Sequence, residues 1–368
     1  MFLSILLLLL QPAEGANSTL SCYDDQGNTV DWFYLYKLPR PHEAPREEGL
    51  KYLLQEEKSE GWVDGSVLVE DTSGALGRTV GPLYEEGELG YILYNDQPPE
   101  KDRLENAHRS AGHTKGVVLF DDKQGFWLVH STPHFPPLKT EGKFSYPESG
   151  TQNGQNFICV TYPLDRFETI GEQLKINQPH VYDCHIPESL ASSVPSMVNL
   201  CKENQHRRNS SNAPPPSYSS ANRSVSLLSL GGKEFISFAK GAAFDNDLYH
   251  SWVAPALQAD LLVQFWRRST GILESDCDPS YKVLNIQLLS PGQKLTFKST
   301  EDHSKWAASV SGDWVCVGDI NRNEAEEKRG GGTVCHKNAV VWKAYRATAL
   351  QCDSCSGAVE QCETALLY

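Results

Sequence analysis

Residues 112–131 read GHTKGVVLFDDKQGFWLVHS, and residues 302–321 read DHSKWAASVSGDWVCVGDIN. Each stretch contains a His-x-Lys tripeptide, then a run rich in aromatic or aliphatic residues, then small polar residues. In both stretches the histidine lies 18 positions before the final polar residue, which is Ser131 or Asn321. We interpret the two stretches as a degenerate repeat, which predicts a protein built from two related halves.

The His-x-Lys spacing suits chemistry on a phosphodiester. In an extended segment, residues i and i+2 point to the same side, so the histidine and the lysine can face one phosphate together. The ammonium group neutralises a non-bridging oxygen while the imidazole attacks phosphorus or moves a proton, and two copies supply a nucleophile and an acid. The candidate catalytic residues are therefore His113, Lys115, His303 and Lys305. Because short tripeptides also occur by chance, the spacing alone leaves open that both histidines are ordinary surface or capping residues.

Strand-like and helix-like segments are mixed along the whole chain. Strands are expected at residues 30–38, 90–94, 116–120, 126–130, 157–162, 234–239, 283–289 and 314–317. Helices are expected at residues 164–176 and 247–266, the second with Trp252, Leu257, Leu261, Leu262 and Phe265 on its apolar face. This mixture favours the α/β class over an all-β sandwich.

The chain divides into four segments. Residues 1–15 are expected to be a signal peptide, because their apolar run is too short to span a bilayer and is followed by small residues. Residues 16–201 form an N-terminal half with the first His-x-Lys, and residues 229–368 form a C-terminal half with the second. Residues 202–228 are rich in Pro, Ser and Asn and are expected to be a linker or loop. No later segment is long and apolar enough to predict a membrane span.

Entry into the secretory pathway explains two further features. The 10 cysteines are expected to form disulfides, because that compartment is oxidising. Sequons for N-glycosylation occur at Asn17, Asn209 and Asn222. The Cys352-x-x-Cys355 motif has no partner motif of the kind that holds zinc, so a zinc hydrolase is disfavoured.

The net charge constrains how the protein can hold its substrate. A formal charge of −14 at pH 7 argues against binding nucleic acid by bulk electrostatics at neutral pH. The 11 histidines have reference pKa values near 6.5, so at about pH 5 most of them are cationic and much of the repulsion is removed. No convergent carboxylate cluster that would hold magnesium is apparent near either His-x-Lys, so no metal ion or other cofactor is expected.

Several longer segments identify a family resemblance. They lie at residues 30–33, 94–99, 112–116, 125–131, 301–306 and 316–322, and they resemble deoxyribonuclease II. The likeness extends from about Cys22 to Cys355. It implies an α/β, phospholipase D-like pseudodimer, in which two β-sheet halves are flanked by helices and the active site lies at their interface. It also implies an acid endonuclease of the lysosome, or a secreted one, that cuts DNA without a metal ion and leaves 3′-phosphate ends.

The resemblance also implies roles for individual residues. It makes the two His-x-Lys pairs catalytic and places Asn321 near the superfamily's downstream asparagine, with Ser131 and His130 as weaker candidates. By analogy with the superfamily's first copy, His113 is expected to be the nucleophile and His303 the acid, although the sequence itself does not order them. The aspartate expected five positions after each lysine is missing, because Phe120 and Val310 stand there.

The resemblance and the spacing together predict five disulfides. The resemblance pairs Cys22 with Cys159, Cys316 with Cys335, and Cys277 with Cys355. Cys184 and Cys201 are paired because they are close in the sequence, which leaves Cys352 with Cys362.

The resemblance also implies DNA as the substrate and no stable protein partner. It leaves both a homodimer and the alpha or beta subtype open. A lipid-directed phosphodiesterase of the same superfamily and an inactive secreted protein of lectin or toxin-like type are the alternatives.

Overall fold

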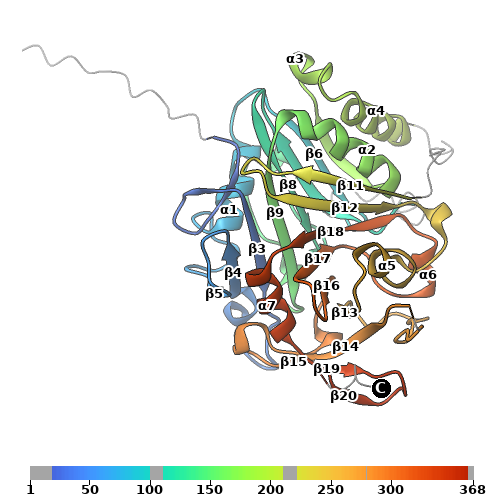
Figure 1. Ribbon diagram of the computed structural model, residues 1–368. Helices are drawn as coiled ribbons and strands as arrows, with labels where there is room; N and C mark the ends of the chain where they lie inside the picture. The colour runs from blue at the N-terminus through green and yellow to red at the C-terminus, as the bar shows by residue number, and fades with distance from the viewer. Residues whose placement is uncertain (1–18, 100–110, 210–221, 279, 364–368) are drawn as a thin grey trace, which may run out of the picture.

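The computed structural model describes residues 19–99, 111–209, 222–278 and 280–363. The expected signal peptide and the sequon at Asn17 lie outside these residues. Two large β-sheets dominate the molecule, with helices packed around them (Figure 1). The architecture is therefore mixed α/β with two sheet-containing halves, as the resemblance implies.

The first sheet belongs to the N-terminal half and is antiparallel throughout. Its strand order is β10-β6-β7-β8-β9-β3-β4-β5. Its strands in chain order are β3 (Trp32–Lys37), β4 (Tyr52–Glu56), β5 (Val63–Asp64), β6 (Gly90–Asn95), β7 (Lys115–Phe120), β8 (Gln124–His130), β9 (Gln155–Pro163) and β10 (Val181–His185). A small hairpin of β1 (Cys22–Tyr23) and β2 (Thr29–Val30) precedes it.

The second sheet belongs to the C-terminal half and is antiparallel except where β13 runs parallel to β14. Its order is β11-β12-β18-β17-β16-β13-β14-β19-β20, with β15 also paired to β14. The strands are β11 (Asn222–Leu228), β12 (Glu234–Lys240), β13 (Leu261–Gln264), β14 (Val283–Leu289), β15 (Phe297–Lys298), β16 (Trp306–Ser309), β17 (Trp314–Gly318), β18 (Gly331–Lys337), β19 (Ala349–Asp353) and β20 (Val359–Gln361).

The α-helices of the described residues are mostly short. They are α1 (Ala75–Val80), α2 (Phe167–Asn177), α3 (Glu188–Ala191), α4 (Pro195–Asn209), α5 (Ala254–Leu257), α6 (Glu324–Glu327) and α7 (Ala339–Thr348). Helix α2 confirms the helix expected at residues 164–176. Within the described part of the chain, no helix combines the length and the apolar character needed to cross a membrane.

The two sheets repeat one arrangement, which confirms the internal repeat. In each half, three consecutive antiparallel strands are followed by a helix: β7, β8, β9 and α2 in the first, and β16, β17, β18 and α7 in the second. The third strand of each set pairs with an earlier strand, β9 with β3 and β18 with β12. The two His-x-Lys elements therefore enter corresponding strands.

Alternation of side chains along the strands builds cores on both faces of the first sheet. Trp32, Tyr34 and Tyr36 of β3 belong to the apolar layer that both sheets share, whereas Phe33 and Leu35 belong to the outer layer under α1. Helix α7 lies against both sheets, because the Tyr345 ring contacts Tyr34 of β3 and Trp306 of β16. This shared layer fixes one half relative to the other.

The helix expected at residues 247–266 is wrong. A π-helical turn (Tyr249–Val253) and α5 occupy its first part, and the helix ends where Gln258 adopts a left-handed conformation with φ of 54°. The rest is β13, where Leu261 and Val263 pack on one side and Leu262 packs on the other. A strand buried on both faces is a continuous apolar run, which imitates the apolar content of a helix.

The linker expected at residues 202–228 is also wrong at both of its ends. Residues 202–209 continue α4, and residues 222–228 form β11, which pairs with β12 along its whole length. Asn209 therefore ends a helix and Asn222 begins a strand. The polar stretch between them, residues 210–221, lies outside the described residues.

All five predicted disulfides are present. They join Cys22 to Cys159, Cys184 to Cys201, Cys277 to Cys355, Cys316 to Cys335 and Cys352 to Cys362. Each of them links segments of the same half. The halves are therefore held together by packing, hydrogen bonds and ion pairs.

Candidate active site

The two His-x-Lys elements occupy equivalent places at the starts of corresponding strands. Lys115 is the first residue of β7, and Lys305 directly precedes β16. The lysine side chains are buried, at 1% and 4% exposure, whereas His113 and His303 are partly exposed. Each element therefore holds its lysine side chain almost fully buried and leaves its histidine partly exposed, although His303 Nε2 itself is buried.

Each histidine is attached to the opposite half through its backbone. The His113 amide donates to the carbonyl oxygen of Gly330 at 2.8 Å, and the His303 amide donates to the carbonyl oxygen of Gly154 at 2.8 Å. Gly330 directly precedes β18, and Gly154 directly precedes β9. The two contacts are reciprocal, and they bring both His-x-Lys elements to the interface between the halves.

The His113 ring is held between groups of both halves. Its Nδ1 lies 2.5 Å from the carbonyl oxygen of Asp319, which fixes the proton on Nδ1 when the ring is neutral. Its Nε2 lies 3.8 Å from Asp96 Oδ2 and 3.8 Å from Glu326 Oε1. Burial lowers the pKa of His113 to about 4, although both carboxylates favour its protonated form.

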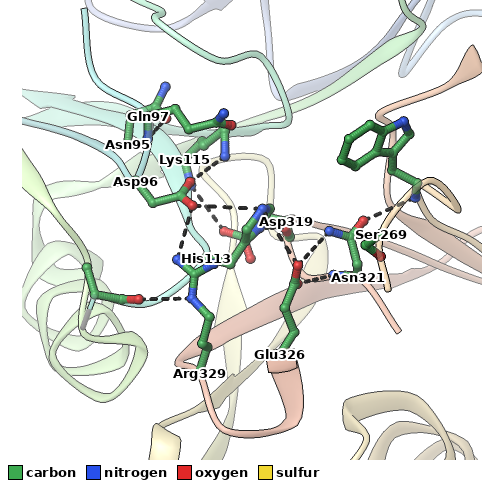
Figure 2. Close-up of polar contacts among 12 residues, drawn as sticks. Asn95, Asp96, Gln97, His113, Lys115, Ser269, Asp319, Asn321, Glu326 and Arg329 are labelled. Carbon is green, nitrogen blue, oxygen red and sulfur yellow. Dashed lines mark hydrogen bonds and ion pairs between the residues drawn. The ribbon is translucent and has the colours of Figure 1, made fainter. Parts of the chain in front are cut away.

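Lys115 belongs to a buried ionic network centred on Asp96. The Lys115 ammonium donates to Asp96 Oδ1, and Arg329 donates to Asp96 Oδ2 at 3.1 Å. Figure 2 shows Asp96 between Lys115 and Arg329, with His113 beside it. Burial opposes ionisation of Asp96, but the positive charges of His113, Lys115 and Arg329 hold its pKa below the usual range. A carboxylate from the first half is thus shared with an arginine from the second.

A second buried carboxylate connects the network to the other histidine. Glu326 accepts hydrogen bonds from the Asn321 amide at 2.5 Å and from Asn321 Nδ2 at 2.7 Å (Figure 2). Asn321 Oδ1 accepts from the backbone amide of Trp266 at 3.1 Å. The Trp266 ring packs edge-on against His303, with centroids 4.5 Å apart. Asn321 therefore helps to position groups beside both histidines.

His303 has cationic surroundings, whereas Lys305 has both a lysine and three carboxylates, Glu326, Asp96 and Asp319, near it. Burial, and then the positive charges of Lys305 and Lys115, lower the pKa of His303 to about 2. His303 Nε2 has no hydrogen-bond partner among the described residues. Burial, and then the charge of Lys115, lower the pKa of Lys305 to about 8. These mutual effects place the charges of the two His-x-Lys pairs near one another.

Asp319 lies between the two lysines. It accepts from the Gly332 amide at 3.2 Å and from the Lys115 amide at 3.4 Å. Burial raises the pKa of Asp319 to about 7, although both hydrogen bonds and the charge of Lys115 oppose the rise. Asp319 therefore gains its negative charge near neutral pH, next to the cations that would hold a phosphate.

The register corrects one equivalence drawn from spacing. Gly116 pairs with Val129, 13 positions away, whereas Trp306 pairs with Val317, 11 positions away. The second hairpin is therefore two residues shorter than the first, and the structural counterpart of Ser131 is Asp319 rather than Asn321.

Ser131 and His130 lie inside the first half. Ser131 donates to Gln155 Oε1 at 2.5 Å and accepts from the Asn156 amide at 3.0 Å, which connects the end of β8 to the start of β9. The His130 ring is fully buried against Phe135 and Phe157. These contacts hold both residues within the first half.

Four charged residues of the site were not singled out by the sequence. They are Asp96, Asp319, Glu326 and Arg329. Asp96 lies within residues 94–99 and Asp319 within residues 316–322, two of the segments that carry the resemblance, but neither stands at a catalytic spacing. Glu326 and Arg329 lie in and after α6, where no pattern marks them.

Metal binding and the zinc alternative can be compared with the observed side chains. Across the described ranges, no group of three or more His, Cys, Asp or Glu residues is arranged to hold a metal ion. Cys352 and Cys355 are both engaged in disulfides, with Cys362 and Cys277. Their sulfur atoms are therefore not available as zinc ligands.

The sequence of this chain is similar to those of several known proteins. The sequence model of the family Deoxyribonuclease II matches residues 21–355. Deoxyribonuclease-2-alpha of Mus musculus is 44% identical over 346 residues, which cover 92% of this chain and 94% of that protein. Deoxyribonuclease-2-beta of Homo sapiens is 37% identical over 347 residues, 92% of each chain, and Plancitoxin-1 of Acanthaster planci is 36% identical over 350 residues, 93% of this chain and 94% of that protein. The chain belongs to the deoxyribonuclease II family.

Proposed function

We propose that this protein is an acid endonuclease that cuts DNA phosphodiester bonds and leaves 3′-phosphate ends, with histidine chemistry in place of a metal ion. The observation that carries the proposal is the reciprocal backbone contact of each histidine with the opposite half. It makes a single site from two His-x-Lys pairs, and neither half could supply a nucleophile and an acid alone.

The lysines have different tasks in this site. Lys115 is already paired with Asp96. Lys305 Nζ forms no hydrogen bond or ion pair with any residue that the structure describes, and the Lys305 side chain as a whole is 4% exposed. An ammonium group in a largely buried site, with no direct partner from the protein, would favour a phosphate oxygen as its ligand. Lys305 is therefore the principal anchor for the scissile phosphate, and Lys115 supports it.

The electrostatic surroundings favour His303 as the nucleophile and His113 as the acid. His303 has cationic neighbours that keep it neutral, and its Nε2 lone pair is not used by the protein. His113 has two carboxylates 3.8 Å from Nε2, which favour its protonated form. A bound phosphodiester adds negative charge and raises the pKa of His113 further. This order reverses the expectation from the resemblance.

The reaction follows in two balanced steps. In the first, His303 Nε2 attacks phosphorus, a phosphorus–nitrogen bond forms, and the bond to the 5′ oxygen breaks as that oxygen takes the proton from His113. In the second, water attacks phosphorus while neutral His113 accepts its proton. The phosphorus–nitrogen bond then breaks, which regenerates His303 and releases a 3′-phosphate end.

Acid conditions favour both binding and the first step. His113 must carry a proton to act as the acid, so the first step slows as pH rises. Asp319 is neutral below about pH 7, and its ionisation above that pH would place a negative charge beside the phosphate. Together with the expected signal peptide and sequons, these properties support work in the lysosome or in an acidic secreted setting. The names of the relatives favour DNA over a lipid as substrate.

Digestion of plasmid DNA at pH 5 with excess chelator tests the proposal. We expect the wild-type protein to cut and the new ends to carry 3′-phosphate, whereas His113→Ala and His303→Ala should not cut. His250→Ala is the matched control, because His250 pairs with Asp276 at 3.0 Å outside the site. Loss of wild-type activity in chelator with restoration by magnesium would contradict the metal-independent route. Cleavage of phospholipid but not DNA would point to the lipid-directed alternative.

A further inference from the structure

Each half contains a buried lysine at an equivalent position of the repeat. Lys37 is the last residue of β3 and pairs with Gln155 of β9. Lys240 is the last residue of β12 and pairs with Gly331 of β18. The two side chains are 0% and 1% exposed. Since neither residue belongs to a His-x-Lys element, the reaction described above gives them no task.

Lys240 organises the segment between α6 and β18. Its ammonium group donates to the carbonyl oxygens of Glu326 at 2.9 Å, Glu327 at 2.8 Å and Arg329 at 2.7 Å. Three donors of one ammonium group are thus satisfied by one turn of backbone. Gly330 follows immediately. The lysine therefore fixes the path of the backbone that enters β18.

This segment holds His113 in three ways. The carbonyl oxygen of Gly330 accepts from the His113 amide, the Glu326 carboxylate lies 3.8 Å from His113 Nε2, and Arg329 binds Asp96, the other carboxylate near that nitrogen. All three groups lie within five consecutive residues. Displacement of the segment would therefore move the surroundings of His113 as a unit.

Lys37 has the corresponding place in the first half. Its ammonium group donates to the carbonyl oxygen of Thr151 at 2.9 Å, in the loop that leads to Gly154 and β9. Gly154 accepts from the His303 amide at 2.8 Å and donates to the carbonyl oxygen of Glu301 at 2.9 Å. The loop fixed by Lys37 therefore holds the segment that carries His303.

Gly154 and Gly330, which accept hydrogen bonds from the two histidine amides, are tightly packed. A Cβ added to Gly154 would lie 2.4 Å from Asp302 Oδ1, and one added to Gly330 would lie 2.1 Å from the carbonyl oxygen of Asn177. Close approach of the Asn177 backbone requires glycine at position 330, and the Asp302 side chain occupies the space beside Gly154. A shift of either loop would therefore be transmitted to the histidine that it contacts.

We propose that Lys240 and Lys37 are positioning residues, one in each half, and that each holds the catalytic histidine of the opposite half. Lys240 positions His113, and Lys37 positions His303. This inference rests on the proposed function, because it takes the two histidines as the reacting groups. Burial lowers the pKa of Lys37 to about 7 and that of Lys240 to about 8, which agrees with ammonium groups withdrawn from water.

The two lysines have separable effects on the reaction. Misplacement of the acid should matter less when the leaving group needs no proton, as in a nucleoside 3′-(p-nitrophenyl phosphate). Misplacement of the nucleophile should slow attack on any substrate. A small displacement at a reacting centre can lower a rate by about 100-fold. Damage to the fold alone would lower the rates with DNA and with the nitrophenyl ester by the same factor.

The test compares Lys240→Met and Lys37→Met in the full-length, disulfide-intact protein. Lys139→Met is the matched control, because Lys139 also binds main-chain carbonyls, those of Leu83 and Glu85, but beside Tyr91 at the far end of β6. Lys240→Gln, whose amide group keeps two N–H donors, is a second variant in case the methionine variant does not fold.

We expect DNA cleavage to fall about 100-fold in both lysine variants and to stay at the wild-type rate in Lys139→Met. With the nitrophenyl ester, Lys240→Met should keep a rapid burst of nitrophenol and then turn over slowly, whereas Lys37→Met should show no burst. Wild-type rates and bursts in both folded variants would overturn the positioning roles. A burst in His303→Ala, together with none in His113→Ala, would instead overturn the order of the histidines.

Discussion

Replacement of Asp96 by asparagine tests the ionic network that supports the site. The Lys115 and Asp96 side chains are only 1% and 7% exposed, so the variant leaves a buried ammonium group without its carboxylate. Removal of one partner of a buried pair costs about 3–5 kcal/mol, because the remaining charge keeps its desolvation penalty. We expect the free energy of unfolding at pH 7 to fall by about that amount.

Urea unfolding with the disulfides intact measures this loss, and the chain offers a matched control. Asp64 also pairs with a lysine, Lys294 at 2.7 Å, but the two side chains are 64% and 50% exposed. Asp64→Asn should therefore cost only about 0–1 kcal/mol. Equal losses in the two variants would refute the importance of the buried network.

The pH dependence of the loss has a definite sign. The pKa of Asp96 is held below its usual range in the folded protein, so its stabilisation is present above about pH 4 and is lost as pH falls further. The difference between Asp96→Asn and the wild type should therefore shrink in acid. Asp96 is also one of the two carboxylates that favour protonated His113, so the variant should lose activity at a lower pH than the wild type.

Three further variants test other parts of the account. Asp319→Asn cannot ionise, so its DNA cleavage should persist to higher pH than that of the wild type, and identical pH–rate profiles would show that Asp319 has no part in the acid preference. Lys305→Arg should lower kcat by 100-fold or more, because a planar guanidinium group cannot take the place of the buried ammonium; cleavage at the wild-type rate would argue against a phosphate anchor at this position. Loss of the Cys22–Cys159 disulfide, which spans 137 residues, should cost about 5 kcal/mol against about 3 kcal/mol for Cys352–Cys362, which spans 10, as measured by denaturant midpoints of the paired alanine variants. The reverse order of midpoints would count against loop-closure entropy.

The strands that carry the site could be predicted from the sequence with few errors. β7 and β8 are apolar runs bounded by polar turns, and the repeat indicated that the second His-x-Lys enters an equivalent strand. β13 could not be predicted, because burial on both faces removes the alternation that marks a strand. The ends of the linker were wrong for a different reason, because polar composition cannot distinguish a loop from a polar helical segment such as the end of α4.

The two His-x-Lys pairs that the structure brings together could be identified from the sequence, but the charged residues around them could not. His113 and His303 share a motif, whereas Asp96 and Arg329 come from loops that only the fold brings together. Contacts across an interface have no fixed sequence separation, so no pattern in the sequence indicates that Glu326 lies near His113. The equal spacing of Ser131 and Asn321 also gave a wrong equivalence. The β16–β17 hairpin is two residues shorter than the β7–β8 hairpin, so the structural counterpart of Ser131 is Asp319.

The central claim is that both halves contribute to one covalent mechanism. Mass spectrometry of protein quenched during turnover of the nucleoside 3′-(p-nitrophenyl phosphate) tests it directly. The account predicts a phosphohistidine on His303, its accumulation in His113→Ala because water attack then lacks a base, and no adduct in His303→Ala. An adduct on each histidine independently, with each single variant keeping more than about a tenth of wild-type DNA cleavage, would contradict a shared site.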